Sequence, residues 1–193
     1  MTDTASGAKN ATLIMDEMSV RRALARVTHE IIERNRGADD LCLLGIRRRG
    51  IPIAAMLRDN ILRFEGVRVP ACELDVTACR DDLSPERKAE LGTQNAIKSL
   101  DPLDPELPDI NGKDVIMVDD VLFTGRTARA AMECIFALGR PKSLQLAVLI
   151  DRGHRELPIR ADYVGKNVPT SRHEKIAVKI SEIDGETCVY LNK

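Results

Sequence analysis

Apolar residues are spaced along the chain in two ways, and together they predict helices alternating with short strands. Residues 16–36 carry apolar side chains at helical intervals, and Gly37 can end that helix in the left-handed conformation. Two further helices are expected, one from Gly50 with Pro52 in its first turn and one over residues 124–138. Short apolar runs predict buried strands at residues 41–46, 71–76, 115–118 and 143–150. This alternation is typical of an α/β fold with a mostly parallel sheet that helices cover on both faces.

The remaining segments have no sustained apolar period. Residues 1–12 are polar and predict a disordered lead. Residues 81–112 are rich in charge and proline, which favours a mobile loop or flap, because loops of this length in compact domains are usually functional or disordered. Short strands are expected at residues 176–180 and 187–191. We therefore expect a single domain over residues 13–193.

Composition narrows the class of protein without changing this picture. The chain has 193 residues, a formal net charge of −1 and 44% hydrophobic residues, so one globular core is expected and nucleic-acid binding would need a local basic face. No apolar run is long enough to span a bilayer and no signal-peptide core is apparent, which predicts a cytoplasmic protein. The five cysteines form no C-x-x-C pair, so we expect reduced thiols rather than disulfides or a zinc site: Cys42, Cys72, Cys79, Cys134 and Cys188.

Two segments that follow predicted strands have the composition of anion sites. Residues 124–127, Thr-Gly-Arg-Thr, lie where a helix begins, so free backbone amides, two hydroxyls and a guanidinium would surround a phosphate. Residues 45–50 also join a strand to a helix, and their three consecutive arginines suit a group with two or three negative charges. Taken alone, the first segment is more often a helix cap and the second a solvated surface.

Asp119 and Asp120 lie at the end of one predicted strand, beside these anion sites. Carboxylates repel phosphate, so the pair suits sugar hydroxyls, Mg²⁺, or both. Ligands of open α/β sheets lie beyond the carboxyl ends of the strands, so one molecule with a phosphate, a polyol and a second phosphate group would match all three features. The compound 5-phosphoribosyl-1-pyrophosphate (PRPP) has this form. Receiver domains also carry a strand-end Asp pair, but early in the chain and without the Thr-Gly-Arg-Thr that follows here.

Residues 115–127 resemble the PRPP-binding signature of type I phosphoribosyltransferases. Other strings are similar to the PyrR family of bifunctional pyrimidine operon attenuators and uracil phosphoribosyltransferases, and they lie at residues 21–30, 73–83, 151–163 and 165–171. The resemblance runs from about residue 16 to the C-terminus. It implies the type I phosphoribosyltransferase fold, in which residues 81–112 form a flexible active-site flap and residues 151–175 a small hood.

The resemblance also implies roles for individual residues. PRPP would be bound by Asp119, Asp120, Thr124, Gly125, Arg126, Thr127, Arg48 and Gly50. Catalytic contacts to the departing pyrophosphate would come from Arg47, Arg49 and Arg80. Uracil would be received by the hood segment Ile150, Asp151 and Arg152. Mg²⁺ is the implied cofactor, and Asp119 and Asp120 would act on it through the ribose hydroxyls. The segment that would bind pyrophosphate, residues 47–50, departs from the family pattern at Arg48, where a small hydroxyl residue is usual.

Members of the PyrR family also bind the leader of pyrimidine messenger RNA, promoted by UMP or UTP, and assemble as dimers or larger oligomers. Here the RNA contacts would form a basic stripe of Arg21, Arg22, Arg26, His29, Arg140 and Lys142, with Arg34 in the same helical stretch. A solvated helix face is the competing interpretation. Three other functions stay open: a purine or orotate phosphoribosyltransferase, a transferase without RNA regulation, and an RNA-binding attenuator without catalysis.

Overall fold

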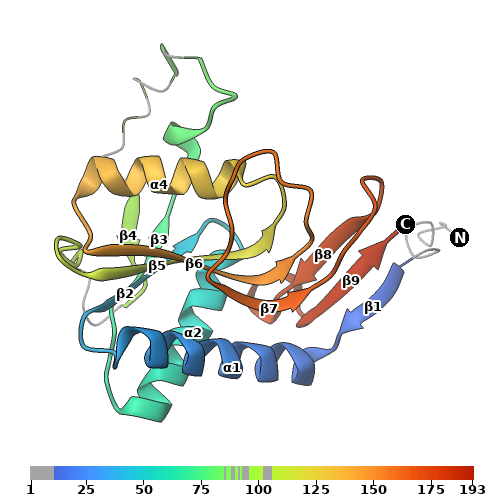
Figure 1. Cartoon of the computed structure of the whole chain (residues 1–193), viewed down its shortest axis with the longest axis horizontal. Helices are drawn as coiled ribbons and strands as arrows, with labels where there is room; N and C mark the ends of the chain where they lie inside the picture. Colours follow the sequence, from blue (N-terminus) through green and yellow to red (C-terminus); the bar gives the residue numbers. More distant parts are fainter. Residues whose placement is uncertain (1–10, 85, 88–89, 91, 93–95, 102–105) are drawn as a thin grey trace, which may run out of the picture.

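The protein is described here by a computed structural model that covers residues 11–84, 86, 87, 90, 92, 96–101 and 106–193. Its main sheet has six described strands in the order β4-β3-β2-β5-β6-β7, all parallel except β4 (Figure 1). Their bounds are β2 Leu41–Ile46, β3 Ala71–Leu74, β4 Ile97–Ser99, β5 Asp114–Leu122, β6 Ser143–Asp151 and β7 Tyr163–Asn167. The two central strands, β2 and β5, are almost wholly buried because helices cover both of their faces.

Helices α1 (Glu17–Asn35) and α2 (Gly50–Glu65) lie on one face of this sheet, and α4 (Arg126–Leu138) lies on the other (Figure 1). Helix α1 begins where the Asp16 side chain accepts a hydrogen bond from the Ser19 amide, and it ends at Arg36 in the left-handed conformation. Each face has its own buried apolar cluster. The predicted α/β fold is therefore confirmed. No helix in the described part of the chain has both the length and the hydropathy that crossing a bilayer requires.

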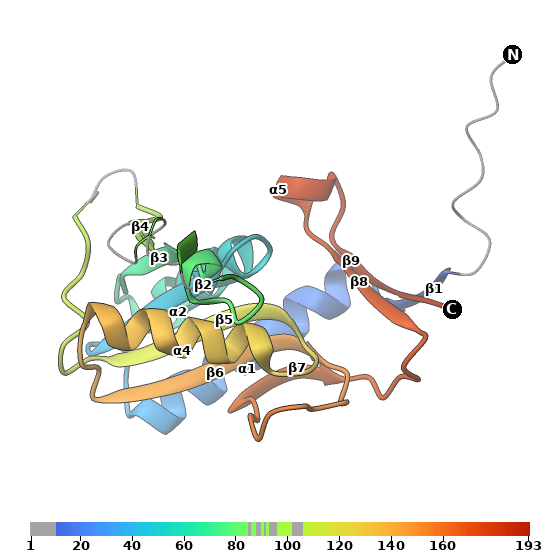
Figure 2. The ribbon, with the colours of Figure 1, turned by 90° about the horizontal axis from the view of Figure 1, so that it is seen from above.

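A second, antiparallel sheet in the order β1-β9-β8 stands beyond the carboxyl edge of the main sheet (Figure 2). It comprises β1 (Ala11–Met15), β8 (Lys175–Lys179) and β9 (Cys188–Asn192), and the short helix α5 (Ser181–Asp184) joins the last two. Val178 and Val189 belong to the same buried cluster as α1, so this sheet shares a core with the main sheet. Strands β8 and β9 were predicted. The disordered lead was wrong at Ala11 and Thr12, which pair with β9, and residues 1–10 lie outside the described residues.

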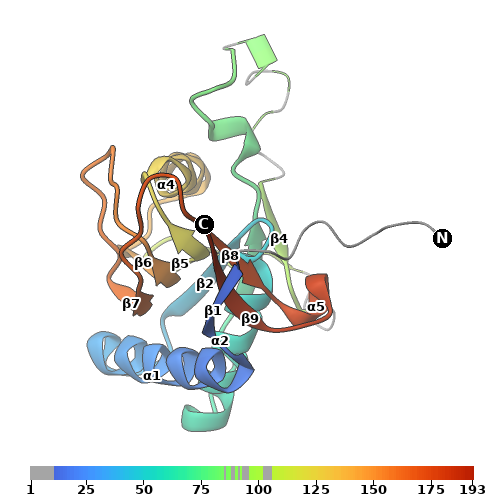
Figure 3. The same ribbon diagram turned by 90° about the vertical axis from the view of Figure 1, so that its right-hand side faces the viewer.

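The expected flap, residues 81–112, is described only in part. The turn η1 (Thr77–Cys79) precedes it, and the chain that follows η1 stands away from the sheet on the α4 side (Figure 3). Strand β4 lies inside the expected flap and pairs antiparallel with β3, with Leu74 opposite Ile97. Apolar periodicity could not predict this strand, because it has only three residues.

Cysteine usage differs from the expectation of five reduced thiols. Cys79, at the end of η1, forms a disulfide with Cys134 of α4, although 55 residues separate them in sequence. Cys42, Cys72 and Cys188 are free and buried. Burial raises the pKa of Cys42 to about 12 and that of Cys72 to about 11, so these two thiols stay protonated at neutral pH. The disulfide attaches η1, which directly precedes the expected flap, to helix α4.

Two glycines allow α2 to begin directly against the central strands. A Cβ atom on Gly45 would lie 2.7 Å from the Gly50 carbonyl oxygen and from the Ile51 Cα. A Cβ on Gly50 would lie 2.2 Å from the Val118 carbonyl oxygen, which no side-chain rotation could relieve. These contacts bring the start of α2 to the residue just before Asp119.

Gly50→Ala is therefore expected to lower the free energy of unfolding by roughly 3 kcal/mol, because α2 must move away from β5. Gly66→Ala is the matched control: Gly66 has a φ of 71° but nothing within 4 Å, so only backbone strain of about 1 kcal/mol is expected. Urea denaturation of both variants measures the difference. Equal losses would contradict the close approach at Gly50.

Candidate active site

The loops that follow β2, β3, β5 and β6 meet at one edge, because parallel strands present their carboxyl ends together (Figure 3). β2 and β5 are direct neighbours, with Gly45 opposite Val118. Residues 47–49, which we call the arginine loop, and residues 124–127, which we call the phosphate loop, therefore lie at the same edge as Asp119 and Asp120. The three predicted features converge, which the sequence alone could not show.

Asp119 and Asp120, the acid pair, are half-buried and close to the end of β5. The Asp120 amide donates to Asp119 Oδ1 at 2.9 Å, and the Val121 amide donates to Asp120 Oδ1 at 2.8 Å. Burial raises the pKa of both carboxyls, and the charge of Asp120 raises the pKa of Asp119 further. Among the described residues no arginine or lysine forms an ion pair with either; Arg49 acts only through its charge, which lowers the pKa of Asp120. Burial therefore disfavours the charged form of the pair, and a bound cation or hydroxyl donor would stabilise that form.

The phosphate loop leads into the N-terminus of α4. Gly125 has a φ of 91° and precedes the first helical residue, Arg126, whose amide donates to Thr124 Oγ1 at 3.3 Å. Arg126 contacts two acids: Nη1 lies 2.5 Å from Asp81 and Nε lies 2.8 Å from Glu156. A cleft of about 370 Å³ adjoins the loop and is lined by Val76, Arg80, Asp81, Asp82, Arg126 and Thr127. The loop has the amides and the cation of an anion site.

Each side chain of the arginine loop has a defined place. Arg47 Nη1 lies 2.7 Å from Asp75, and its Nε lies 3.5 Å from Glu73, the two acids of the β3 end. Arg49 forms two hydrogen bonds with Asp184 of α5, at 2.9 and 3.2 Å. Arg48 is exposed, and the Arg47–Arg48 peptide bond is cis. The loop is therefore tied to β3 on one side and to the second sheet on the other.

Arg80, predicted at the base of the flap, lines the cleft beside the phosphate loop and pairs with Asp82 at 2.7 Å. The Arg80 side chain is 54% exposed. It shares this cleft with Arg126.

The hood segment at the end of β6 uses its side chains within the protein. Ile150 is fully buried, and Arg152, 7% exposed, donates to Thr170 Oγ1 and to the Ser171 and Glu174 carbonyl oxygens. Asp151 accepts from the Gly153 amide and from Arg155. Contacts from Ile150 and Arg152 to a base would therefore come from their backbone atoms.

Phe123 is a further candidate site residue, which sequence reasoning missed. The residue is 37% exposed and lies between the acid pair and the phosphate loop in sequence, and the Arg152 guanidinium carbon lies 4.1 Å from its ring centroid. The available signal in the sequence was an aromatic residue directly before the Thr-Gly-Arg-Thr segment. The ring offers an apolar face beside the hood on which a planar base could lie.

The expected basic stripe follows α1. Arg21 and Arg22 line a groove of about 310 Å³ between α1 and α2 together with Arg63, which sequence reasoning missed. Arg26 donates to the Val164 and Gly165 carbonyl oxygens of β7, at 2.9 and 2.8 Å.

The far end of the stripe lies beyond the C-terminus of α1. His29, within α1, stacks on Phe64 of α2 with ring centroids 4.2 Å apart, an aromatic neighbour that the sequence did not predict. Lys142 lies near the C-terminus of α1 and pairs with Asp114 at 2.8 Å, and Arg140 is two residues before it in the same turn. The predicted stripe residues therefore face different neighbours, β7 for Arg26, α2 for His29 and the loop before β6 for Lys142, and acids lie among them.

A phosphoribosyl transferase domain model matches residues 12–182. The bifunctional protein PyrR of Clostridium novyi is 53% identical over 92% of this chain and 95% of its own. The bifunctional protein PyrR of Pelotomaculum thermopropionicum is 53% identical over 95% of this chain and 97% of its own.

Solved structures show the same fold at lower identity. The hypoxanthine-guanine phosphoribosyltransferase of Bacillus anthracis has a TM-score of 0.61 at 20% identity, covering 95% of this chain and 99% of that one. The Leishmania tarentolae enzyme in complex with GMP has a TM-score of 0.67 at 18% identity, covering 97% and 99%. At these identities the structures support the fold alone, whereas the bifunctional relatives match nearly the whole chain. The chain is therefore a member of the PyrR family of phosphoribosyltransferases.

Proposed function

We propose that the protein transfers the phosphoribosyl group of PRPP to uracil, giving UMP and pyrophosphate. The observation that carries this proposal is the position of the acid pair, at one edge of the sheet with the arginine loop and the phosphate loop. A ribose lying on Asp119 and Asp120 would direct its 5-phosphate to residues 124–127 and its pyrophosphate to residues 47–49. The identity to bifunctional relatives supports uracil over a purine or orotate as the base.

The reaction breaks the bond between the anomeric carbon and pyrophosphate and forms a bond to a uracil nitrogen, which loses its proton. Such a carbon passes through an oxocarbenium-like state, so positioning and stabilisation of the leaving group matter more than a strong nucleophile. Arg47 and Arg49 would donate to the departing pyrophosphate. Arg80 would reach bound PRPP from the base of the flap, and a closed flap would exclude competing water.

The donor set of the acid pair fits Mg²⁺, because two half-buried carboxylates without a described ion-pair partner favour a hard cation nearby. Among the described residues no group of three acidic, histidine or cysteine side chains could hold a metal alone. Mg²⁺ bound with PRPP would neutralise charge that develops on pyrophosphate. The protein's own contribution would be to hold the ribose hydroxyls with Asp119 and Asp120.

We also propose that the basic stripe along α1 binds the leader of pyrimidine messenger RNA in a nucleotide-dependent way, as the regulatory half of a bifunctional cytoplasmic protein. The groove of Arg21, Arg22 and Arg63 supplies cations to phosphates, and the His29–Phe64 pair supplies aromatic surface for an unstacked base. A homodimer or larger oligomer would place two stripes on one RNA.

Asp119→Asn is expected to lower UMP formation from uracil and PRPP with Mg²⁺ by about 100-fold, because it removes charge at the ribose. Asp114→Asn is the control on the same strand: Asp114 lies at the opposite end of β5 and pairs with Lys142 and Ser143. A steady-state assay should show wild-type turnover for the control. No UMP from the wild-type protein, with hypoxanthine or orotate accepted instead, would overturn the choice of base.

The same substitution is expected to increase stability. Because burial raises the pKa of Asp119 in the folded state, the unfolded carboxyl ionises first and stability falls as pH rises above its ordinary pKa of 3.8. Asp119→Asn lacks this loss. Its free energy of unfolding should therefore exceed that of the wild-type protein at pH 7 and should converge with it below pH 3.8. A pH series of urea denaturation measures the difference, and a less stable variant at pH 7 would contradict the assignment.

Arg22→Gln is expected to weaken binding to a pyrimidine leader hairpin and to reduce the slope of log affinity against log salt by about one, as for one lost phosphate contact. Lys98→Gln removes the same charge from β4, at the other edge of the main sheet, and should leave binding unchanged. Filter binding at several salt concentrations, with and without UMP, tests both. Equal affinity for a scrambled hairpin would exclude specific recognition.

A further inference from the structure

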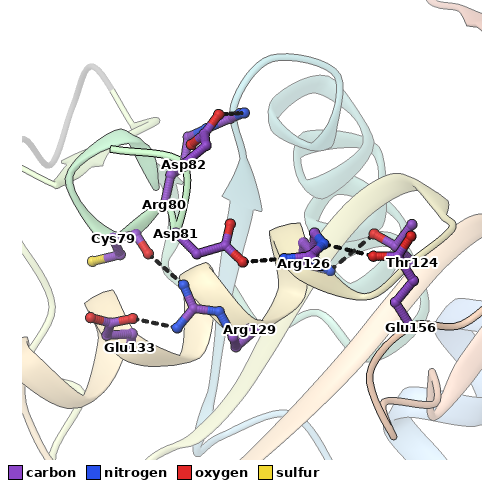
Figure 4. Close-up of polar contacts among 9 residues, drawn as sticks. All are labelled: Cys79, Arg80, Asp81, Asp82, Thr124, Arg126, Arg129, Glu133 and Glu156. Atoms are coloured by element: carbon purple, nitrogen blue, oxygen red, sulfur yellow. Dashed lines mark hydrogen bonds and ion pairs between the residues drawn. The ribbon is translucent and has the colours of Figure 1, made fainter. Parts of the chain in front are cut away.

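The guanidinium of Arg126 lies between two carboxylates that come from different segments (Figure 4). Nη1 contacts Asp81 Oδ2 at 2.5 Å and Nε contacts Glu156 Oε2 at 2.8 Å. These side chains are only partly covered, with 52% of Arg126, 40% of Asp81 and 53% of Glu156 exposed. Two acids around one guanidinium oppose the binding of a phosphate dianion to the phosphate loop.

The two acids are attached to the protein differently. Glu156 is fixed to the phosphate loop by its backbone, because the Glu156 and Leu157 amides both donate to the Thr124 carbonyl oxygen, at 3.0 and 3.1 Å. Asp81 belongs to the start of the flap, and its contact with Arg126 is made by its side chain. Asp81 can therefore leave Arg126 when the segment that follows Cys79 moves, whereas the Glu156 backbone stays with the phosphate loop and only its side chain could turn away.

The chain just before Asp81 is anchored to α4. Cys79 is bonded to Cys134, and its carbonyl oxygen accepts from Arg129 Nη2 at 2.9 Å (Figure 4). Arg129 is itself held by Glu133, one turn along the helix, at 2.7 Å. A movement of the flap would thus pivot beyond Cys79, and the Arg126–Asp81 contact lies two residues past that anchor.

We propose that Asp81 is a positioning residue that occupies Arg126 in place of a phosphate and yields it when a phosphomonoester binds, which releases the start of the flap. The proposal rests on the proposed binding of the 5-phosphate by residues 124–127. An arginine that has a carboxylate partner is held in a fixed geometry, and a phosphate offers it more charge and more acceptor oxygens than Asp81 does. Phosphate binding and the docked state of Asp81 then oppose each other, and by linkage each weakens the other equally.

The test is the affinity for ribose 5-phosphate, measured by calorimetry on the full chain. Asp81→Asn should bind it about 2- to 5-fold more tightly, the range expected when one exposed ion pair no longer competes. Uridine, which lacks the phosphate, should bind both proteins equally. Glu133→Gln removes the same charge from the neighbouring Arg129 pair and should leave the affinity for ribose 5-phosphate unchanged.

Equal or weaker binding of ribose 5-phosphate by Asp81→Asn would overturn the inference while leaving the transferase intact. Absence of binding to the wild-type protein would instead refute the phosphate site itself.

Discussion

The site depends on two adjacent carboxylates held at the carboxyl end of a central parallel strand. Burial opposes the charge of Asp119 and Asp120, and each backbone amide that donates to them also fixes their orientation. Neighbouring residues on a strand point to opposite faces of the sheet. Both carboxyls nevertheless remain partly accessible near the carboxyl end of β5. Within the part of the chain that the structure describes, no arginine or lysine forms an ion pair with either carboxyl, and Arg49 acts on Asp120 only through its charge.

Each arginine proposed to contact PRPP, apart from Arg48, already has an acidic partner in the structure. Arg47 pairs with Asp75, Arg49 with Asp184, Arg80 with Asp82 and Arg126 with Asp81 and Glu156. These partners come from β3, α5, the flap and the hood, so every segment around the site contributes one. Pairing fixes long side chains near their working positions, and an incoming phosphate exchanges one anion for another rather than ordering a free side chain.

The main elements could be predicted from the sequence because their apolar patterns are distinctive. These patterns are continuous apolar runs in β2 and β6 and a long helical period in α1. The sequence also indicated the acid pair and the two loops, since each joins a strand to the next element along the chain. It missed the short strands β1, β4 and β7, and it missed the disulfide, whose two cysteines meet only because η1 and α4 pack together. It could not show the acidic partners either. Asp184 lies 135 residues from Arg49, and only the packing of the second sheet brings them into contact.

Strand β7 contacts both the hood end of β6 and helix α1, the elements of the two proposed activities. Asp151, at the end of β6, pairs with Asn167 and accepts from the Val168 amide at 2.8 Å, so the hood end of β7 is bonded to the site. Arg26 of α1 donates hydrogen bonds to the Val164 and Gly165 carbonyl oxygens of the same strand. A Cβ on Gly165 would meet the Leu149 carbonyl oxygen at 2.5 Å, which keeps β7 close against β6. A base bound at the hood and an RNA bound along α1 would therefore both lie next to elements that contact β7, which gives the two proposed sites one shared strand.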